Sequence, residues 1–215
     1  MGKVEKELQK IINNCTPKLA VEEILHLSSV SGSYSYDNRY LHRFFKMNTA
    51  PLLMSAKVFP NIKEITESVG AFVAIQNHII DKYVSRTDEV DVYVVGDGHS
   101  PRTGALIACL TKWNVKSIDP QMRGKQWNIK RLETYKNKAE ELTFEGKNNS
   151  AVVVCVHSHA KISDCIKMLH GYSEIHLVNI PCCFKADIDK KPNVSYTDIG
   201  IQSEKQQVDL YFNCH

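Results

Sequence analysis

Three residues within the stretch 90–120 are suited to holding a nucleoside. Gly96 and Gly98 follow an apolar run, 92–95, rich in β-branched residues and typical of a buried strand. Glycine has no Cβ, so the backbone can turn sharply there and a ligand can approach the main chain. Asp119 lies roughly 20 residues beyond the glycines, the offset at which a carboxylate accepts hydrogen bonds from ribose hydroxyls. This order of strand, Gly-x-Gly turn, helix, strand and Asp predicts a Rossmann-like nucleoside site.

A helix and a second strand must position these residues. Ser100 is expected to cap the helix, and Pro101 suits its first turn, where a missing N–H costs nothing. Residues 105–110 then supply an apolar helical face, and 115–118 form the next strand. Arg102, at the helix start, could meet a carboxylate or phosphate of a substrate; the alternative is a solvated first-turn residue.

A later strand, predicted over 151–156, ends in His157 and His159. In an open parallel sheet, ligands bind beyond the carboxyl ends of the strands, so both histidines are expected on the rim that carries the glycine turn. Either imidazole could accept a proton, since histidine titrates near neutral pH. An equally weighted alternative is that one of them only hydrogen-bonds the rim.

The strand predicted over 175–180 runs into Pro181, Cys182 and Cys183. If the strands are parallel, these residues reach the same rim and could contact a substrate. The cysteines could be nucleophiles, although adjacent cysteines after a strand are as often small core residues. Four polar or unusual segments thus converge on one edge, which is the main functional indication in the sequence.

The chain divides into a helical N-terminal region, 1–86, packed on an α/β domain over 87–215. Amphipathic helices are predicted at 3–14 and, after a proline, over 60–83. The basic and aromatic segment 39–47 could touch nucleic acid, but we favour a helix with its aromatic residues in the core.

Beyond the second strand, the pattern predicts a third strand at 131–135 and a helix at 162–169. Strand-like pieces at 194–199 and 208–212 can form an antiparallel hairpin. The expected fold is therefore α/β and Rossmann-like, with a mostly parallel sheet, an antiparallel C-terminal hairpin and a helical N-terminal extension.

The composition is that of an ordinary globular chain. Its 215 residues are 43% hydrophobic and 24% charged, with a net charge of +3, which is compatible with an RNA partner without indicating one. No apolar run is long enough to cross a bilayer, so no membrane partner is expected. Seven cysteines without a CxxC pair indicate reduced thiols, and hence a cytoplasmic protein.

Four motifs together resemble S-adenosylmethionine-dependent methyltransferases: VGDGHSP, SIDP, CVHSHA and NIPCCF, each after a predicted strand between residues 88 and 185. The closest resemblance is to the subgroup with a Pro-Cys-Cys motif after strand five, to which several RNA-modifying enzymes belong. The resemblance implies a methyltransferase-type sheet, S-adenosylmethionine as cofactor, and RNA or another nucleophile as methyl acceptor.

The resemblance also implies roles for the residues after the first three strands. The implied cofactor contacts are Gly96, Asp97 and Gly98 for the methionine part, Asp119 for the ribose hydroxyls, and Ala139 and Glu140 near the adenine.

By the same resemblance, His157 and His159 would face the transferred methyl, and Arg102, Pro181 and Cys182 are the expected substrate contacts. Two features depart from the family pattern. Val94 stands where an acidic residue usually precedes the first glycine, and no Asn-Pro-Pro-Tyr follows the fourth strand.

Three alternatives stay open at this level. A catalytically inactive Rossmann-like module would bind a partner through the helical region. A metal site could combine His157 and His159 with Cys182 and Cys183, although the spacing matches no standard zinc pattern. A nicotinamide-dependent oxidoreductase shares the turn, but the sequence shows no evident Tyr-Lys pair for it.

Overall fold

The computed structural model describes residues 37–182 and 186–214 of the chain, so the helix predicted over 3–14 and the residue Cys183 lie outside the described part. The described elements are α3 (Arg39–Phe45), α4 (Ala50–Ser55), α5 (Ile62–His78), β1 (Asp91–Val95), α6 (Arg102–Leu110), β2 (Asn114–Ile118), β3 (Leu132–Tyr135), the 3-10 turn η1 (Ala139–Glu141), β4 (Phe144–Glu145), β5 (Ser150–Val156), α7 (Ile162–Lys167), β6 (Leu169–His170), β7 (Glu174–Ile180), β8 (Val194–Thr197) and β9 (Gln207–Tyr211).

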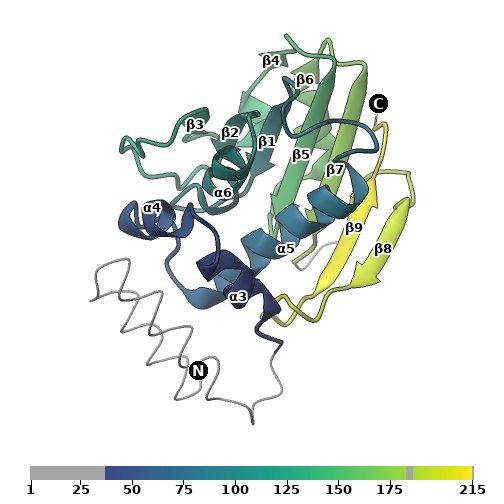
Figure 1. Ribbon diagram of the computed structural model, residues 1–215. Coiled ribbons are helices and arrows are strands. Elements are labelled where there is room, and N and C mark those ends of the chain that lie inside the picture. The colour runs from purple at the N-terminus through teal and green to yellow at the C-terminus, as the bar shows by residue number, and fades with distance from the viewer. Residues whose placement is uncertain (1–36, 183–185, 215) are drawn as a thin grey trace.

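Seven of the strands form one sheet in the order β3-β2-β1-β5-β7-β9-β8 (Figure 1). The pairs from β3 to β7 are all parallel, whereas β9 runs antiparallel to both β7 and β8. The chain steps outward from β1 to β3 and then returns to β5 beside β1, so the strand order reverses between β1 and β5. The predicted fold class, a mostly parallel Rossmann-like sheet with an antiparallel C-terminal hairpin, is confirmed by this topology.

Alternate residues of β1 face opposite sides of the sheet and join two separate cores. Val92 and Val94 pack in a cluster under α3, α5 and α6. Tyr93 and Val95 pack in a smaller cluster on the other face, beneath α7 and η1. Strands buried on both faces explain why the sequence shows continuous apolar runs there rather than alternation.

Helix α5 crosses the sheet face that carries the larger core (Figure 1). Its N-cap Asn61 accepts a hydrogen bond from the Glu64 N–H at 3.0 Å. The helix was predicted to reach residue 83 but ends at His78, because the chain turns there and Ile80 pairs with Val84 in an isolated bridge. The apolar residues beyond the helix are still buried, which is why the stripe continued past the helix end.

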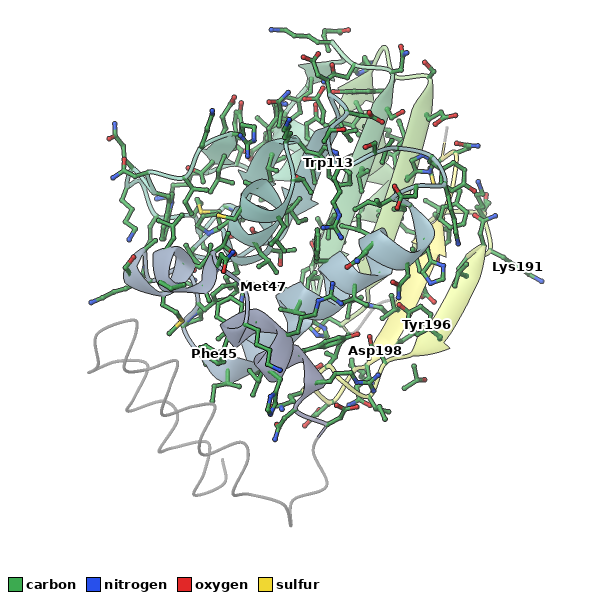
Figure 2. The ribbon with its side chains drawn as sticks, in the orientation of Figure 1. Phe45, Met47, Trp113, Lys191, Tyr196 and Asp198 are labelled. Carbon is green, nitrogen blue, oxygen red and sulfur yellow. The ribbon has the colours of Figure 1, made fainter. Side chains whose placement is uncertain are left out.

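The segment 39–47 forms α3, with Tyr40, Leu41, Phe44 and Phe45 buried, so its aromatic residues serve the core as expected. Phe45, in the last turn of α3, is labelled in Figure 2.

The Tyr40 hydroxyl donates to Asp198, which Figure 2 labels beside the end of β8. This bond joins the described N-terminal helices to the C-terminal hairpin.

The helix predicted over 162–169 is also shorter than expected. Helix α7 ends at Lys167, and the next residues form β6, which pairs in parallel with β4 in a separate two-stranded sheet. Gly171 follows with a φ of +75°, a conformation that glycine adopts without strain. None of the helices in the described ranges is long and apolar enough to span a membrane.

Candidate functional site at the carboxyl edge of the sheet

The strand register brings the predicted rim residues side by side. Val95 of β1 is opposite Ile118 of β2, and the Gly96 N–H donates to the Ile118 carbonyl at 2.8 Å, so Gly96 and Asp119 leave the sheet together. Across the switch point, Val95 also pairs with Cys155 of β5. The carboxyl ends of β1, β2 and β5 therefore meet at one edge, as the sequence predicted.

The last of the four segments leaves the sheet at the same edge. Val156 of β5 is opposite Ile180 of β7, and the His157 N–H donates to the Ile180 carbonyl at 2.8 Å. His157 and Pro181 therefore begin their loops next to each other. Cys182 is half-buried beside Pro181.

The turn after β1 is shaped by two glycines in the left-handed region, Gly96 with φ +78° and Gly98 with φ +82°. A Cβ on Gly96 would lie 2.3 Å from the Oγ of Ser158, which belongs to the loop after β5. The two loops that flank the switch point are thus in contact, and only glycine fits at position 96.

The Asp97 carboxylate is turned under the start of α6. Its Oδ1 accepts from the Thr103 N–H at 2.9 Å, and its Oδ2 accepts from the Gly104 N–H at 3.0 Å and from the Ser117 hydroxyl at 2.7 Å. Burial raises the pKa of Asp97 to about 6, against the lowering effect of these hydrogen bonds. Asp97 thus satisfies the first-turn N–H groups of the helix, and its backbone alone is left to line a ligand.

The prediction that Ser100 caps this helix is wrong. The Ser100 hydroxyl instead donates to the Val58 carbonyl at 2.6 Å and ties the turn to the segment before α5. The helix has Pro101 at its N-cap position without a side-chain cap bond. Asp97 takes the capping task because its buried carboxylate reaches two helix N–H groups at once.

Asp119 lies at the tip of β2 and binds the glycine turn directly. Its Oδ2 accepts from the Gly98 N–H at 2.8 Å, and its Oδ1 accepts from the Gln121 N–H at 2.7 Å. The residue is 9% exposed. Each carboxylate oxygen can accept a further hydrogen bond, so Asp119 could accept from two ribose hydroxyls.

Arg102 lies over the same turn rather than in solvent. Its Nε donates to the Asp97 carbonyl at 2.7 Å, and its Nη1 forms an ion pair with Glu64 in the first turn of α5. A Cβ on Gly98 would lie 2.7 Å from the Arg102 guanidinium. Burial lowers the pKa of Arg102, and the nearby Asp119 opposes that effect.

His157 has a left-handed backbone, with φ +50°, which is uncommon for a residue with a side chain. Its Nε2 lies 3.0 Å from Oε1 of Glu67 and 3.1 Å from the Ser203 hydroxyl. Glu67 is buried in α5 and also lies 3.1 Å from the Lys63 ammonium. The sequence did not single out Glu67, because a carboxylate within a helix that is otherwise apolar on one face looks like an ordinary solvated position.

The remaining predicted residues lie around these. His159 is exposed on the loop after β5. Ala139 is buried in η1, and Glu140 beside it is exposed, with its carboxylate 3.7 Å from Lys138. The turn η1 packs against α7, on the sheet face opposite α5. Within the described ranges, no three His, Cys, Asp or Glu side chains are grouped so that they could hold a metal ion.

A cavity of about 430 Å³ opens beside the glycine turn. Gly98, Ser100 and Arg102 form one wall, and the other includes Phe59 from the segment between α4 and α5 and Glu64 from the first turn of α5. The site thus combines a backbone turn, a carboxylate that binds that turn, and an adjoining hollow.

No family model and no curated protein matches this sequence. Among solved structures, MtNAS in complex with MTA and tNA is 12% identical over 99% of this chain and 96% of that chain, with a TM-score of 0.40. A SAM-dependent methyltransferase from Leishmania major is 8% identical over 97% and 82%, and coclaurine N-methyltransferase with N-methylheliamine and SAH is 10% identical over 82% and 62%, both with TM-scores of 0.40. Similarities of this size assign no activity to this chain.

Proposed function

We propose that this protein is an S-adenosylmethionine-dependent methyltransferase. The observation that carries the proposal is the hydrogen bond from the Gly98 N–H to the Asp119 carboxylate at the carboxyl edge of the sheet, beside the strand-order reversal. Nucleosides bind to Rossmann-like sheets at this place. The mostly parallel sheet closed by an antiparallel C-terminal hairpin also agrees with the resemblance seen in the motifs.

The residues of the rim fit such a cofactor by their hydrogen-bonding groups and by the shape of the glycine turn. Asp119 would accept hydrogen bonds from the ribose hydroxyls, and the backbone of the turn from Gly96 to Gly98 would line the methionine part. Ala139 and Glu140 would lie toward the adenine. When bound, the cofactor supplies an electrophilic methyl group on a sulfonium centre.

His157 and His159 are the proposed catalytic residues. One of their imidazoles would take the proton that the acceptor loses as its lone pair forms the new bond to carbon and the sulfur–carbon bond breaks. Glu67 and Ser203 would orient His157 through its Nε2. Pro181 and Cys182 would contact the acceptor, for which the resemblance suggests RNA or another nucleophile.

The second candidate is a catalytically inactive Rossmann-like binding module. It is favoured by one observation: the Arg102 guanidinium already lies on the Gly98 turn, held there by Glu64. In such a module the protein's own side chains would occupy the space that a cofactor uses in an enzyme.

Calorimetric titration of the full chain with S-adenosylmethionine, S-adenosylhomocysteine and NAD, each separately, tests the proposal. We expect both adenosyl compounds to bind. Asp119→Asn keeps the shape and one acceptor but removes the charge, and should weaken both affinities roughly 10- to 100-fold, since a hydrogen bond to a charged group is worth about 1.5–3 kcal/mol.

Glu89→Gln removes one exposed carboxylate just before the amino end of β1, at the opposite end of that strand from the turn, and serves as the matched control, with unchanged affinity expected. Thermal unfolding of each variant checks that the fold is kept. Binding of neither adenosyl compound to the wild-type protein would favour the inactive module, and binding of NAD alone would favour an oxidoreductase.

A further inference from the structure

The cavity beside the glycine turn carries an excess of positive charge. Lys57, Arg102 and Arg123 line it, with Glu64 as the one carboxylate among the described lining residues. Glu64 is already paired with Arg102. Within the described ranges, neither the Lys57 ammonium nor the Arg123 guanidinium lies in an ion pair, so their charge is available to a bound anion.

The backbone of both cations is fixed at the cavity by hydrogen bonds. The Lys57 N–H donates to the Met54 carbonyl at 3.0 Å, and Lys57 takes the left-handed conformation, with φ +55°, just after α4. The Arg123 N–H donates to the His99 carbonyl at 3.0 Å, which joins the loop after β2 to the glycine turn. The two long side chains are exposed, but they start from backbone positions that these hydrogen bonds fix.

The loop that carries Arg123 is also tied to the end of α4. The Lys125 ammonium donates to the Ala56 carbonyl at 3.2 Å and lies 4.0 Å from the centre of the Trp127 ring. These contacts hold the loop beside Lys57, so the backbone positions that carry both cations are set by the fold.

Part of the cavity wall is apolar. Phe59 is 6% exposed and packs edge-to-face on Phe44, with ring centres 5.3 Å apart. Met54 and Pro60 add further apolar surface. A hollow that combines some apolar surface with a few convergent charged groups has the form of a small-molecule site.

The cavity adjoins the proposed cofactor position. Gly98 lines the cavity, and its N–H is bound by Asp119, the residue assigned to the ribose. A molecule in the cavity would therefore lie next to the cofactor, as a methyl acceptor must. His157, His159, Pro181 and Cys182 do not line the cavity, so the acceptor would extend past the turn to reach them.

We infer that this cavity binds the methyl acceptor, and that the acceptor is a small molecule with an apolar body and an anionic carboxylate or phosphate group held by Lys57 and Arg123. This inference rests on the proposed methyltransferase function. Arg102, which the sequence suggested for a substrate anion, has its charge matched by Glu64 and serves mainly as a wall.

Calorimetric titration with phenyl phosphate, benzoate and neutral benzyl alcohol, in the presence of S-adenosylhomocysteine, tests this site. We expect at least one anion to bind and benzyl alcohol to bind at least roughly tenfold more weakly. The two anions distinguish a phosphate from a carboxylate site. Amide chemical shifts of Gly98 and Ser100 should move on binding, because both residues line the cavity.

The double variant Lys57→Asn with Arg123→Gln should weaken anion binding by about 100-fold, roughly tenfold for each cation. Asparagine is chosen at position 57 because it tolerates a positive φ. Lys130→Gln with Lys167→Gln removes the same charge from exposed positions outside the cavity and should leave the affinity unchanged.

Three results would overturn the inference. Failure of both anions to bind, or equal loss in the control, would show that the cavity is not an anion site. A weaker affinity for S-adenosylhomocysteine but not for 5′-methylthioadenosine in the double variant would assign the cations to the cofactor's own carboxylate. Loss in that variant of binding to a short oligoribonucleotide, without phenyl phosphate binding, would assign them to RNA.

The methyltransferase proposal and the anion site are tested by different titrations, so either can fail without the other. If S-adenosylhomocysteine does not bind the wild-type protein, the methyltransferase proposal is wrong, and the assignment to a methyl acceptor falls with it. The same titration with phenyl phosphate alone then reports whether the cavity binds anions.

Discussion

Two carboxylates near the glycine turn have different structural roles because their surroundings differ. Asp97 is buried beneath α6, where two helix N–H groups and the Ser117 hydroxyl surround it. Asp119 lies at the rim and binds Gly98. The sequence predicted the place of Asp119, because strand length fixes the offset. It could not predict the direction of Asp97, which is decided by N–H groups that have no other partner once the helix forms.

The buried carboxyl of Asp97 makes stability depend on pH. Its pKa is about 6 in the folded protein against 3.8 ordinarily, so between these values the folded protein holds a proton that the unfolded chain has released. Stability from this group is fully present below about pH 4 and is lost as the pH rises through 6. We expect the unfolding free energy of the wild type, relative to Asp97→Asn, to fall by about 2 kcal/mol between pH 4 and pH 7.

Urea titrations of both proteins at several pH values measure this difference. Asp209→Asn, a carboxylate in the hairpin strand β9, is the control and should not reproduce the pH dependence of Asp97→Asn. A free-energy difference that stays constant over this range would show that Asp97 is not protonated in the folded state.

At the scale of the elements, α6 approaches β2 unusually closely at Gly104. A Cβ there would lie 3.0 Å from the Ser117 Cβ, 3.2 Å from the Asp97 carboxylate and 3.3 Å from the Leu132 side chain. The sequence predicted an apolar face on this helix over 105–110, but not the close contact at Gly104. The ends of helices were also harder to predict than the helices themselves. Residues 79 and 80 are buried although they follow α5, so the apolar pattern in the sequence runs past the end of the helix.

Gly104→Ala should therefore destabilise the protein by about 1–2 kcal/mol, since overpacking against a rigid strand exceeds the gain in helix propensity. Gly124→Ala is a matched control, because no atom lies within 4 Å of the added Cβ, and its effect should stay within about 0.5 kcal/mol. Chemical denaturation measures both. If Gly104→Ala changed stability no more than Gly124→Ala, or stabilised the protein, α6 would be shown to move away from β2.

At the scale of the whole molecule, the sheet separates two cores that share no side chain. The larger core lies under α3, α5 and α6, and the smaller one under α7 and η1. The sequence predicted the sheet and the meeting of its strand ends. It did not predict the cavity wall from α4 and the loop after β2, because those contacts join segments far apart in the chain and without regular patterns.

We expect substitutions in the two cores to be independent. Ile107→Val in the larger core and Ile175→Val in the smaller one should each cost about 0.5–1.5 kcal/mol, and the double variant should equal their sum within about 0.5 kcal/mol. Urea unfolding of the three variants gives the coupling energy. A coupling above about 1 kcal/mol would show that the sheet transmits strain between its faces.

The strand order of the sheet determines which backbone edges are open to other chains. It places β3 and β8 outermost, each four residues long. Their outward positions include Glu133, Ser195 and Thr197, which are exposed and polar. Short, polar edge strands of this kind discourage edge-to-edge aggregation, so strands of neighbouring molecules are not expected to pair with this sheet.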